Sequence, residues 1–379
     1  MKTEKRTVIV LGNGFDMALG MKTSYKSFRK SRFWPFKNSK DGLAYFLNLK
    51  TEKNNWFDLE QLLAEYAEQK YKEHDNSFCE LDKENFFILS ERLKEFIADR
   101  ENRVRISRKN KIITKFIDIL LEYNEQYNPF DHETIIFSFN YTDLNTLITK
   151  VTGRVSNIDY YHIHGSIKNN DIIIGVDDAV KFDPKYDFLR KVSNPSYHSS
   201  ILFNSLIHAD DVIVFGHSLG KNDYHFFQHF FEIHSDVKKI KPDEDCSITI
   251  FTKDQQSRMD ILHNLRMMNG SKNNQLFALN NLKFIFTEGD KSTFYQWLDD
   301  IYIEDSARED FKDDEYMEIL HQLLEELPKS LSSRLGELDE REILTEIRKD
   351  FLRNYLRDRL NEKWQSIMQG DSQIADIQP

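Results

Sequence analysis

The chain opens with an apolar, mostly β-branched run at residues 7–11 that leads directly into Gly12, Asn13 and Gly14. Because this run has no polar alternation, it suits a strand that is buried on both faces, as in a parallel sheet. Gly12 and Gly14 allow a tight turn and a close approach of the backbone to a ligand. Asp16 can cap a following helix whose amide groups point towards phosphate. The segment therefore predicts the first strand and a ligand-binding turn of an α/β fold.

The glycine turn departs from G-x-G-x-x-G, the dinucleotide fingerprint of dehydrogenases. Met17 stands in the place of the third glycine, and the next glycine is Gly20. Two interpretations therefore stay open, a nucleotide cradle and a strand-to-helix turn without a ligand. The cradle would consist of Gly12, Asn13, Gly14, Phe15 and Asp16.

Further strand candidates recur along the chain with helical patterns between them. The candidates are residues 134–139, 160–164, 171–176, 211–215, 247–252 and 282–286. Helical patterns follow at residues 143–151, 222–234 and 255–268. This alternation predicts a Rossmann-like, doubly wound, mostly parallel sheet in an α/β domain over residues 1–305. The helical stretch at about 23–127 is predicted to be an insertion after the first strand.

The composition shifts to dense charge from about Ser306. Apolar residues recur there at helical spacing, so residues 306–379 are predicted to form a helical C-terminal appendage. It either packs on the main domain or forms a homo-oligomer or partner contact. The stripe consists of Leu344, Ile347, Phe351, Tyr355 and Leu356.

The charge balance bears on the class of partner. The chain has 63 acidic and 52 basic residues and a formal charge of −11, which argues against a nucleic acid bound on a broad basic face. A local basic cluster at 100–111 is interpreted as a solvated connection between helices. Cys79 and Cys246 are too few for a disulfide framework and fit a reducing cytosol. The first apolar run is too short for a signal peptide or membrane span, so a cytoplasmic protein without a membrane partner is expected.

Polar side chains follow two of the predicted strands. Asn140 ends one strand, and its amide suits a ligand hydroxyl or a water molecule, although a turn role is the common alternative. His162 and His164 are two apart, which places both on one face of a strand. Such a pair suits a general base, a metal site or a structural role. Because no third ligand has a recognisable spacing, no metal is predicted.

The predicted strand at 211–215 leads into Gly216-His217-Ser218-Leu219-Gly220. This segment matches the G-x-S-x-G elbow of α/β-hydrolases, in which the serine is the nucleophile. Asp236 or Asp243 with His263 would satisfy the order of such a triad, but no local sequence favours them. We prefer a ligand-binding turn with Asp223 capping the next helix.

The motifs form an ordered set over about residues 8–225 that resembles the bacterial AbiH abortive-infection family. The resemblance implies an antiphage effector and a phage-derived trigger. The matching segments are Leu11–Gly12–Asn13–Gly14–Phe15–Asp16 with Gly20, Thr23–Ser24–Tyr25, Asn54–Asn55–Trp56–Phe57–Asp58–Leu59–Glu60, Phe139–Asn140–Tyr141–Thr142, His162–Ile163–His164–Gly165, and Gly216–His217–Ser218 with Asp223.

The AbiH family in turn is similar, more remotely, to the sirtuin-like domains of bacterial antiphage NADases. In that comparison Asn140 and His164 fall on the catalytic Asn and His. The implied activity is hydrolysis of the nicotinamide–ribose bond of NAD, which is then a substrate rather than a cofactor. The implied contacts to NAD or a related nucleotide are Gly12, Asn13, Gly14, Phe15, Asp16, Gly165, Gly216, Ser218 and Asp223.

Two departures from the sirtuin-like pattern limit what this resemblance implies. Two cysteines cannot form the four-cysteine zinc module of deacetylating sirtuins, so protein deacetylation is not implied. Asp16 stands near the place where the glycine turn usually has a serine, which changes the expected ribose contact. A serine hydrolase using Ser218 and a non-catalytic nucleotide sensor or interaction module remain the alternatives.

Overall fold

The structure is a computed structural model, and it describes residues 5–53, 58–104, 111–123, 132–197, 200–238, 246–288, 293–294 and 296–297. The chain divides into two compact units, Met1–Lys291 and Ser292–Pro379. Every element described below belongs to the first unit. The predicted appendage at 306–379 lies outside the described residues, and the predicted domain boundary at 305 stays a prediction.

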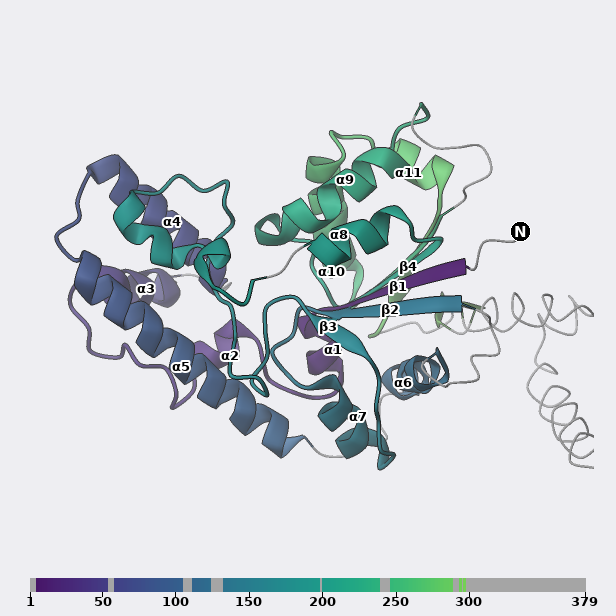
Figure 1. The fold of residues 1–379 in the computed structure, drawn as a ribbon, viewed down its shortest axis with the longest axis horizontal. Coiled ribbons are helices and arrows are strands. Elements are labelled where there is room, and N and C mark those ends of the chain that lie inside the picture. Colours follow the sequence, from purple (N-terminus) through teal and green to yellow (C-terminus); the bar gives the residue numbers. More distant parts are fainter. Residues whose placement is uncertain are drawn as a thin grey trace, which may run out of the picture. The chain divides into compact units, whose positions relative to one another are not determined.

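The first unit is built on one six-stranded sheet in which every strand pair is parallel (Figure 1). The strand order is β3-β2-β1-β4-β5-β6, which is the order of the Rossmann fold. The predicted α/β class is therefore confirmed. The strands are β1 (Lys5–Leu11), β2 (His132–Ser138), β3 (Tyr160–His162), β4 (Asp211–Phe215), β5 (Ser247–Thr252) and β6 (Asn281–Phe286).

The strand order reverses between β1 and β4, which are neighbours in the sheet. Leu11 at the end of β1 is paired with Ser138 of β2 and with Phe215 of β4. The carboxyl ends of these three strands therefore lie level with one another. In open parallel sheets this reversal is where ligands bind, because the loops leave the strands in opposite directions there.

Helices cover both faces of the sheet (Figure 1). On one face, Phe15 and Phe116 form ring contacts with Phe215 of β4. On the other, Val8 and Val10 of β1 belong to a buried apolar cluster with helix residues that follow β3. This two-sided burial explains the unbroken apolar strands. The first face carries α1 (Asn13–Ala18), α6 (Lys111–Tyr123) and α7 (Leu144–Thr152), and the second carries α8 (Ser200–Ile207), α9 (Tyr224–His234), α10 (Gln255–Met268) and α11 (Asn273–Leu279).

A second apolar core lies in a cap made from two excursions of the chain, one after β1 and one after β3. Asp82 joins them, because its Oδ2 accepts hydrogen bonds from the hydroxyls of Tyr66 (2.6 Å) and Tyr186 (2.9 Å). Its Oδ1 accepts from the Leu43 amide at 2.6 Å. The cap elements are α2 (Tyr25–Arg29), α3 (Gly42–Lys53), α4 (Leu59–Glu73), α5 (Cys79–Arg103), and the 3-10 turns η1 (Pro184–Leu189) and η2 (Lys191–Ser193).

The structure corrects three interpretations. Asp16 does not cap the helix after β1, because α1 begins at Asn13 with Gly12 in the N-cap position and Asp16 lies inside it. The predicted strand at 171–176 is wrong, since only an isolated bridge from Val176 to Arg190 is present. Ile172, Ile174 and Val176 instead pack in the cap core, so their β-branched pattern reflects burial outside the sheet. The basic cluster at 100–111 is not a connection throughout, because α5 continues to Arg103.

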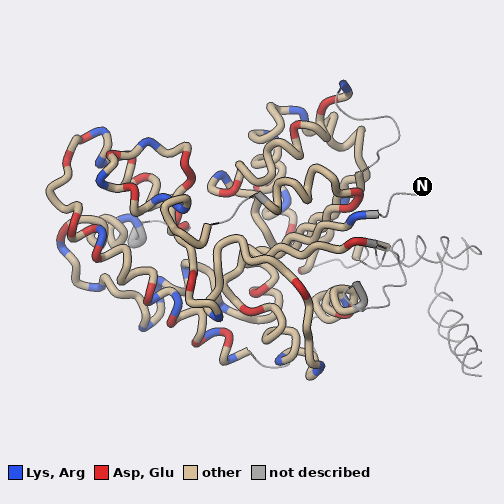
Figure 2. The backbone as a smooth tube through the Cα atoms, viewed as in Figure 1, with Lys and Arg blue, Asp and Glu red and all other residues tan. Residues whose placement is uncertain are grey.

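Charge is distributed as this burial requires. Figure 2 shows acidic and basic residues mixed along the cap helices, while the central lengths of β1 and β2 carry neither. In the parts of the chain that the structure describes, no helix is both long enough and apolar enough to cross a bilayer.

Candidate functional site

Two glycine turns meet where the sheet order reverses. The Gly14 amide donates to the Gly216 carbonyl at 2.8 Å, and the Gly12 amide donates to the Phe215 carbonyl at 2.9 Å. Gly216 has a φ of +67°, and a Cβ atom there would lie 2.4 Å from the Phe15 nitrogen. Glycine is therefore required for the turn after β4 to lie against the turn after β1.

The predicted nucleotide cradle is largely engaged with the protein itself. The Gly14 amide is used by Gly216, and Phe15 is buried against Phe215. The Asn13 side chain accepts a hydrogen bond from the Thr23 hydroxyl at 2.6 Å. These contacts account for the turn as a structural unit, and its binding of a nucleotide stays a prediction.

Asp16 lies at the centre of a buried set that we call the Asp16 network, formed by Asp16, Asn140 and Thr142. The carboxylate of Asp16 accepts from Asn140 Nδ2 at 2.8 Å and from Thr142 Oγ1 at 2.9 Å. Asn140 Nδ2 also donates to the Gly12 carbonyl at 3.1 Å. Both N–H groups of the amide are thus used, which fixes its orientation and leaves Oδ1 as the acceptor. Burial raises the pKa of Asp16 to about 7, although the two donors oppose the shift.

A second buried set, the lysine cluster, comprises Lys191, Glu60, Asp223, His164 and His217. Lys191 Nζ lies 2.9 Å from Glu60 Oε2, 3.2 Å from Asp223 Oδ1 and 3.3 Å from His164 Nε2. Asp223 also lies 3.4 Å from His164 Nε2 and, through Oδ2, 3.3 Å from His217 Nε2. Glu60 and Lys191 come from the cap, whereas the other three follow β3 and β4. The cluster therefore ties the cap to the edge of the sheet.

The protonation states in the lysine cluster follow from burial and from the central ammonium. Burial, helped by the Lys191 charge, lowers the pKa of His164 to about 4, so its ring is neutral at physiological pH. Burial raises the pKa of Glu60 to about 8, although the Lys191 charge opposes the shift. Burial opposes ionisation of Asp223 as well, but Lys191 and the histidines keep its pKa well below the usual range. Asp223 is therefore the ionised partner of Lys191.

The hydrogen bonds of His217 assign its tautomer. Its Nδ1 accepts from the Leu219 amide at 3.0 Å, so the ring proton lies on Nε2, which faces Asp223. The ring of Phe139 packs on His217 and His164, with centroid distances of 4.3 and 5.1 Å. Because Phe139 directly precedes Asn140, it places the lysine cluster beside the Asp16 network.

His162 and His164 enter different surroundings. His162 Nδ1 lies 3.1 Å from the Asn140 carbonyl and its Nε2 lies 3.2 Å from the Tyr160 hydroxyl. The strand β3 ends at His162, so strand alternation does not extend to His164. Gly165, which follows with a φ of +68°, lies where the chain returns beside Asp171.

The turn that contains Ser218 differs from a nucleophile elbow. Positive φ occurs at Gly216 and Leu219, and not at Ser218. Both nitrogens of His217 are engaged, by Leu219 and Asp223, and no histidine among the described residues hydrogen-bonds to Ser218 Oγ. Asp243 lies outside the described residues. A 3-10 turn at Lys221–Asp223 separates Ser218 from the next α-helix, which begins at Tyr224, so the geometry gives the hydrolase alternative no support. Asp223 occupies the N-cap position of that helix, but the predicted capping is wrong, because its side chain makes no capping hydrogen bond.

Sequence reasoning missed Lys191 altogether and quoted Glu60 only as part of a motif. Lys191 is 1% exposed. Lysine is rarely buried so completely unless it is paired, and here it lies beside the carboxyl groups of Glu60 and Asp223. Its local sequence carries no signal of burial. The acidic residue at the start of α4 was visible, but a helix-start role accounts for such a residue without a site.

The sequence was compared with models of known protein families and with curated proteins. The sequence model of the family described as "Bacteriophage abortive infection AbiH" matches residues 8–241, which include both glycine turns, the Asp16 network and the lysine cluster. No curated protein matches the chain.

Proposed function

The chain belongs to the AbiH family of bacteriophage abortive infection proteins, and on that premise we propose that it protects bacteria by hydrolysing NAD at the nicotinamide–ribose bond. The observation that carries this proposal is the neutral, buried His164 held beside Asp223 next to the Asn140 turn. This group lies at the reversal of a parallel sheet, where nucleotides commonly bind. The remote similarity of the same motifs to sirtuin-like NADases adds support.

In the proposed reaction, water attacks C1′ of the nicotinamide ribose while the C1′–N bond breaks. The bonding electrons return to the cationic pyridinium ring, so nicotinamide leaves as a neutral molecule. The water oxygen bonds to C1′, giving ADP-ribose, and a water proton passes to His164 and then to solvent. A positioned base of this kind contributes roughly 10²–10⁴-fold to the rate.

The residues around His164 suit the role of a base. Nε2 either accepts from Lys191 Nζ or donates to Asp223. In the tautomer in which Nε2–H donates to Asp223, the lone pair lies on Nδ1 and can take a proton. Asn140 Oδ1 would accept a hydrogen bond from the attacking water or a ribose hydroxyl. Asp16 would act as a positioning residue, because it fixes the orientation of that amide.

The closed cap sets a condition on this activity. Asn140 and His164 are 6% and 5% exposed, and the lysine cluster covers His164 from the cap side. Substrate entry therefore requires Lys191 and Glu60 to move away from Asp223. We propose that the resting protein is held closed by these contacts and that a phage-derived trigger opens it.

The test is made in infected bacteria that express the full chain, so that any trigger is present. We expect NAD to fall and nicotinamide and ADP-ribose to rise after infection with the native protein. Asn140→Ala and His164→Ala should each reduce NAD loss at least about 100-fold and abolish protection. His208→Ala is the matched control, because His208 is a histidine outside both networks whose Nδ1 contacts only the Asn204 carbonyl.

Circular dichroism of the purified variants establishes that each is folded. Protection with unchanged NAD, or NAD loss at native rates in both folded variants, would contradict the proposal. Binding of NAD by equilibrium dialysis without any product would favour the non-catalytic nucleotide sensor.

A further inference from the structure

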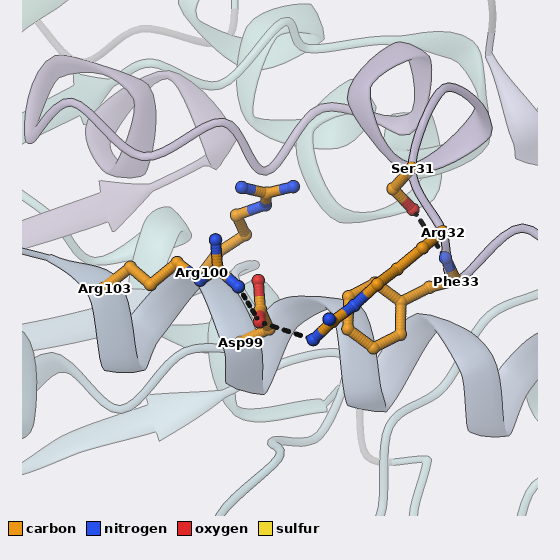
Figure 3. Close-up of a pocket in the computed structure, with 6 residues that line it drawn as sticks. All are labelled: Ser31, Arg32, Phe33, Asp99, Arg100 and Arg103. Atoms are coloured by element: carbon orange, nitrogen blue, oxygen red, sulfur yellow. Dashed lines mark hydrogen bonds and ion pairs between the residues drawn. The ribbon is translucent and has the colours of Figure 1, made fainter.

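A cavity of about 280 Å³ lies in the cap, away from both networks described above. It opens between the segment after α2 and the last turns of α5, as Figure 3 shows. Three of its lining side chains are arginines and one is acidic. The lining residues are Ser31, Arg32, Phe33, Asp99, Arg100 and Arg103.

One carboxylate serves two of the three arginines. Asp99 Oδ1 lies 2.7 Å from Arg103 Nη2 and 3.3 Å from Arg32 Nη2. Figure 3 shows Asp99 between these two side chains, while the guanidinium of Arg100 points away from it into the cavity. The three guanidinium groups and one carboxylate leave a formal excess of positive charge on the lining.

Arg100 has an unused donor. Its Nε is buried and, among the described residues, has no hydrogen-bond partner. Its guanidinium packs over the ring of Phe96, with 4.9 Å from Cζ to the centroid. A cation–π contact accounts for the flat face of the group but not for the N–H in its plane. Burying a donor without an acceptor costs free energy, so a ligand acceptor that draws this N–H towards the cavity would remove that cost.

We propose that this cavity binds a small phosphorylated molecule through Arg100, Arg103 and Arg32. Guanidinium groups match phosphate oxygens in pairs, and the uncompensated charge selects an anion. The volume lies at the small end for ligand pockets, which favours a mononucleotide or smaller ligand over a dinucleotide. Phe33, which lines the cavity under Arg32, offers an apolar surface beside the charged groups.

The site is distinct from the proposed NAD site, although α5 contacts the loop that follows Asn140. Glu101, next to Arg100 on α5, accepts a hydrogen bond from the Asp143 amide at 2.9 Å. Asp143 caps α7 three residues after Asn140. An anion bound by Arg100 therefore acts on the end of α5 that supports the loop carrying Asn140.

The proposal is tested by calorimetric titration of the purified full chain with inorganic pyrophosphate and, separately, with AMP at physiological ionic strength. We expect one binding site, and at least a tenfold weaker affinity in Arg100→Ala and in Arg103→Gln. The second variant guards against misfolding, because the Arg103 side chain is 61% exposed. Arg92→Ala is the matched control, since Arg92 lies on the same helix but pairs with Glu95 and does not line the cavity.

Three results would overturn the proposal. They are no binding of either probe by the native chain up to about 5 mM, native affinity in both arginine variants, and an equal loss in Arg92→Ala, which would indicate unspecific charge attraction. Native NAD turnover with a lost pyrophosphate site would leave the NAD proposal intact, because neither variant touches its residues.

Discussion

The ammonium group of Lys191 lies within ion-pair distance of two carboxylates and is 1% exposed. Isolating such charges from water costs several kcal/mol each, and the cost is offset only while the partners stay together. The effect of each charged residue in this cluster on the stability of the fold therefore depends on whether its partners are present.

Replacing Lys191 with Met should lower the free energy of unfolding by about 3–5 kcal/mol, because the buried carboxylate of Asp223 loses its counter-charge. Lys168→Met is the control, since Lys168 pairs with Asp143 at 3.1 Å but is 65% exposed. Its loss should cost less than about 1 kcal/mol. Urea unfolding measures both. Equal effects would show that burial does not strengthen the Lys191 pairs.

Asp16→Asn should alter the pH dependence of stability. The pKa of Asp16 rises from 3.8 to about 7 in the folded protein, so between these values the folded state holds a proton that the unfolded state has lost. The contribution of Asp16 to stability is therefore largest in acid and falls as the pH rises to about 7. Asn does not titrate.

The difference in free energy of unfolding, native minus Asp16→Asn, should fall by roughly 2–4 kcal/mol between about pH 4 and pH 8. The opposite contribution of His164, whose pKa is lowered, is common to both proteins and cancels in this difference. Chemical unfolding at several pH values gives the measurement. A difference that is independent of pH would show that Asp16 is ionised throughout.

The two turns after β1 and β4 act as one element. They are joined by the hydrogen bond from the Gly14 amide to the Gly216 carbonyl, and their backbones touch. This contact closes the sheet edge at the point where the strand order reverses. Only backbone atoms form this contact, and a side chain at Gly216 would prevent it.

Gly216→Ala should destabilise the protein by more than the cost of a positive φ alone. Gly20→Ala is the matched control, because Gly20 has a φ of +87° and no atom within 4 Å of an added Cβ. That control should cost about 1 kcal/mol. At Gly216 the added Cβ would lie 2.4 Å from the Phe15 nitrogen, so a loss of several kcal/mol, or of folded protein, is expected. Unfolding free energies within about 0.5 kcal/mol of each other would refute the close approach.

The sequence predicts a feature well where neighbouring residues determine it, and poorly where residues distant in the chain do. The strands at 211–215 and 247–252 were predicted to the residue, because short runs rich in apolar and β-branched residues suit buried strands. The run at 171–176 has a similar apolar pattern but packs in the cap. The pattern shows that these residues are buried, and it does not show whether they pair in the sheet. Lys191 could not be found, because its partners Glu60 and Asp223 are distant in sequence.

At the scale of the whole chain, the part beyond the sheet unit carries a separate prediction. A chain that ends at Ile303 should form particles with fewer subunits than the full chain, because the apolar stripe from Leu344 to Leu356 would bury area between subunits. The number of subunits is the mass from light scattering divided by the mass of the chain. NAD turnover per subunit serves as the control for an intact sheet unit. An unchanged number of subunits would leave these residues as packing elements within one subunit.

The cap is assembled from pieces that leave the ribosome at different times. Tyr186 donates to Asp82 across 104 residues of sequence, so the two partners emerge roughly 5–20 s apart at ordinary rates of synthesis. During that interval the apolar sides of α4 and α5 lack the residues from the second excursion that later cover them. A nascent chain of this protein therefore leaves this apolar surface uncovered until η1 has been made, and slow codons between the two excursions would lengthen that exposure.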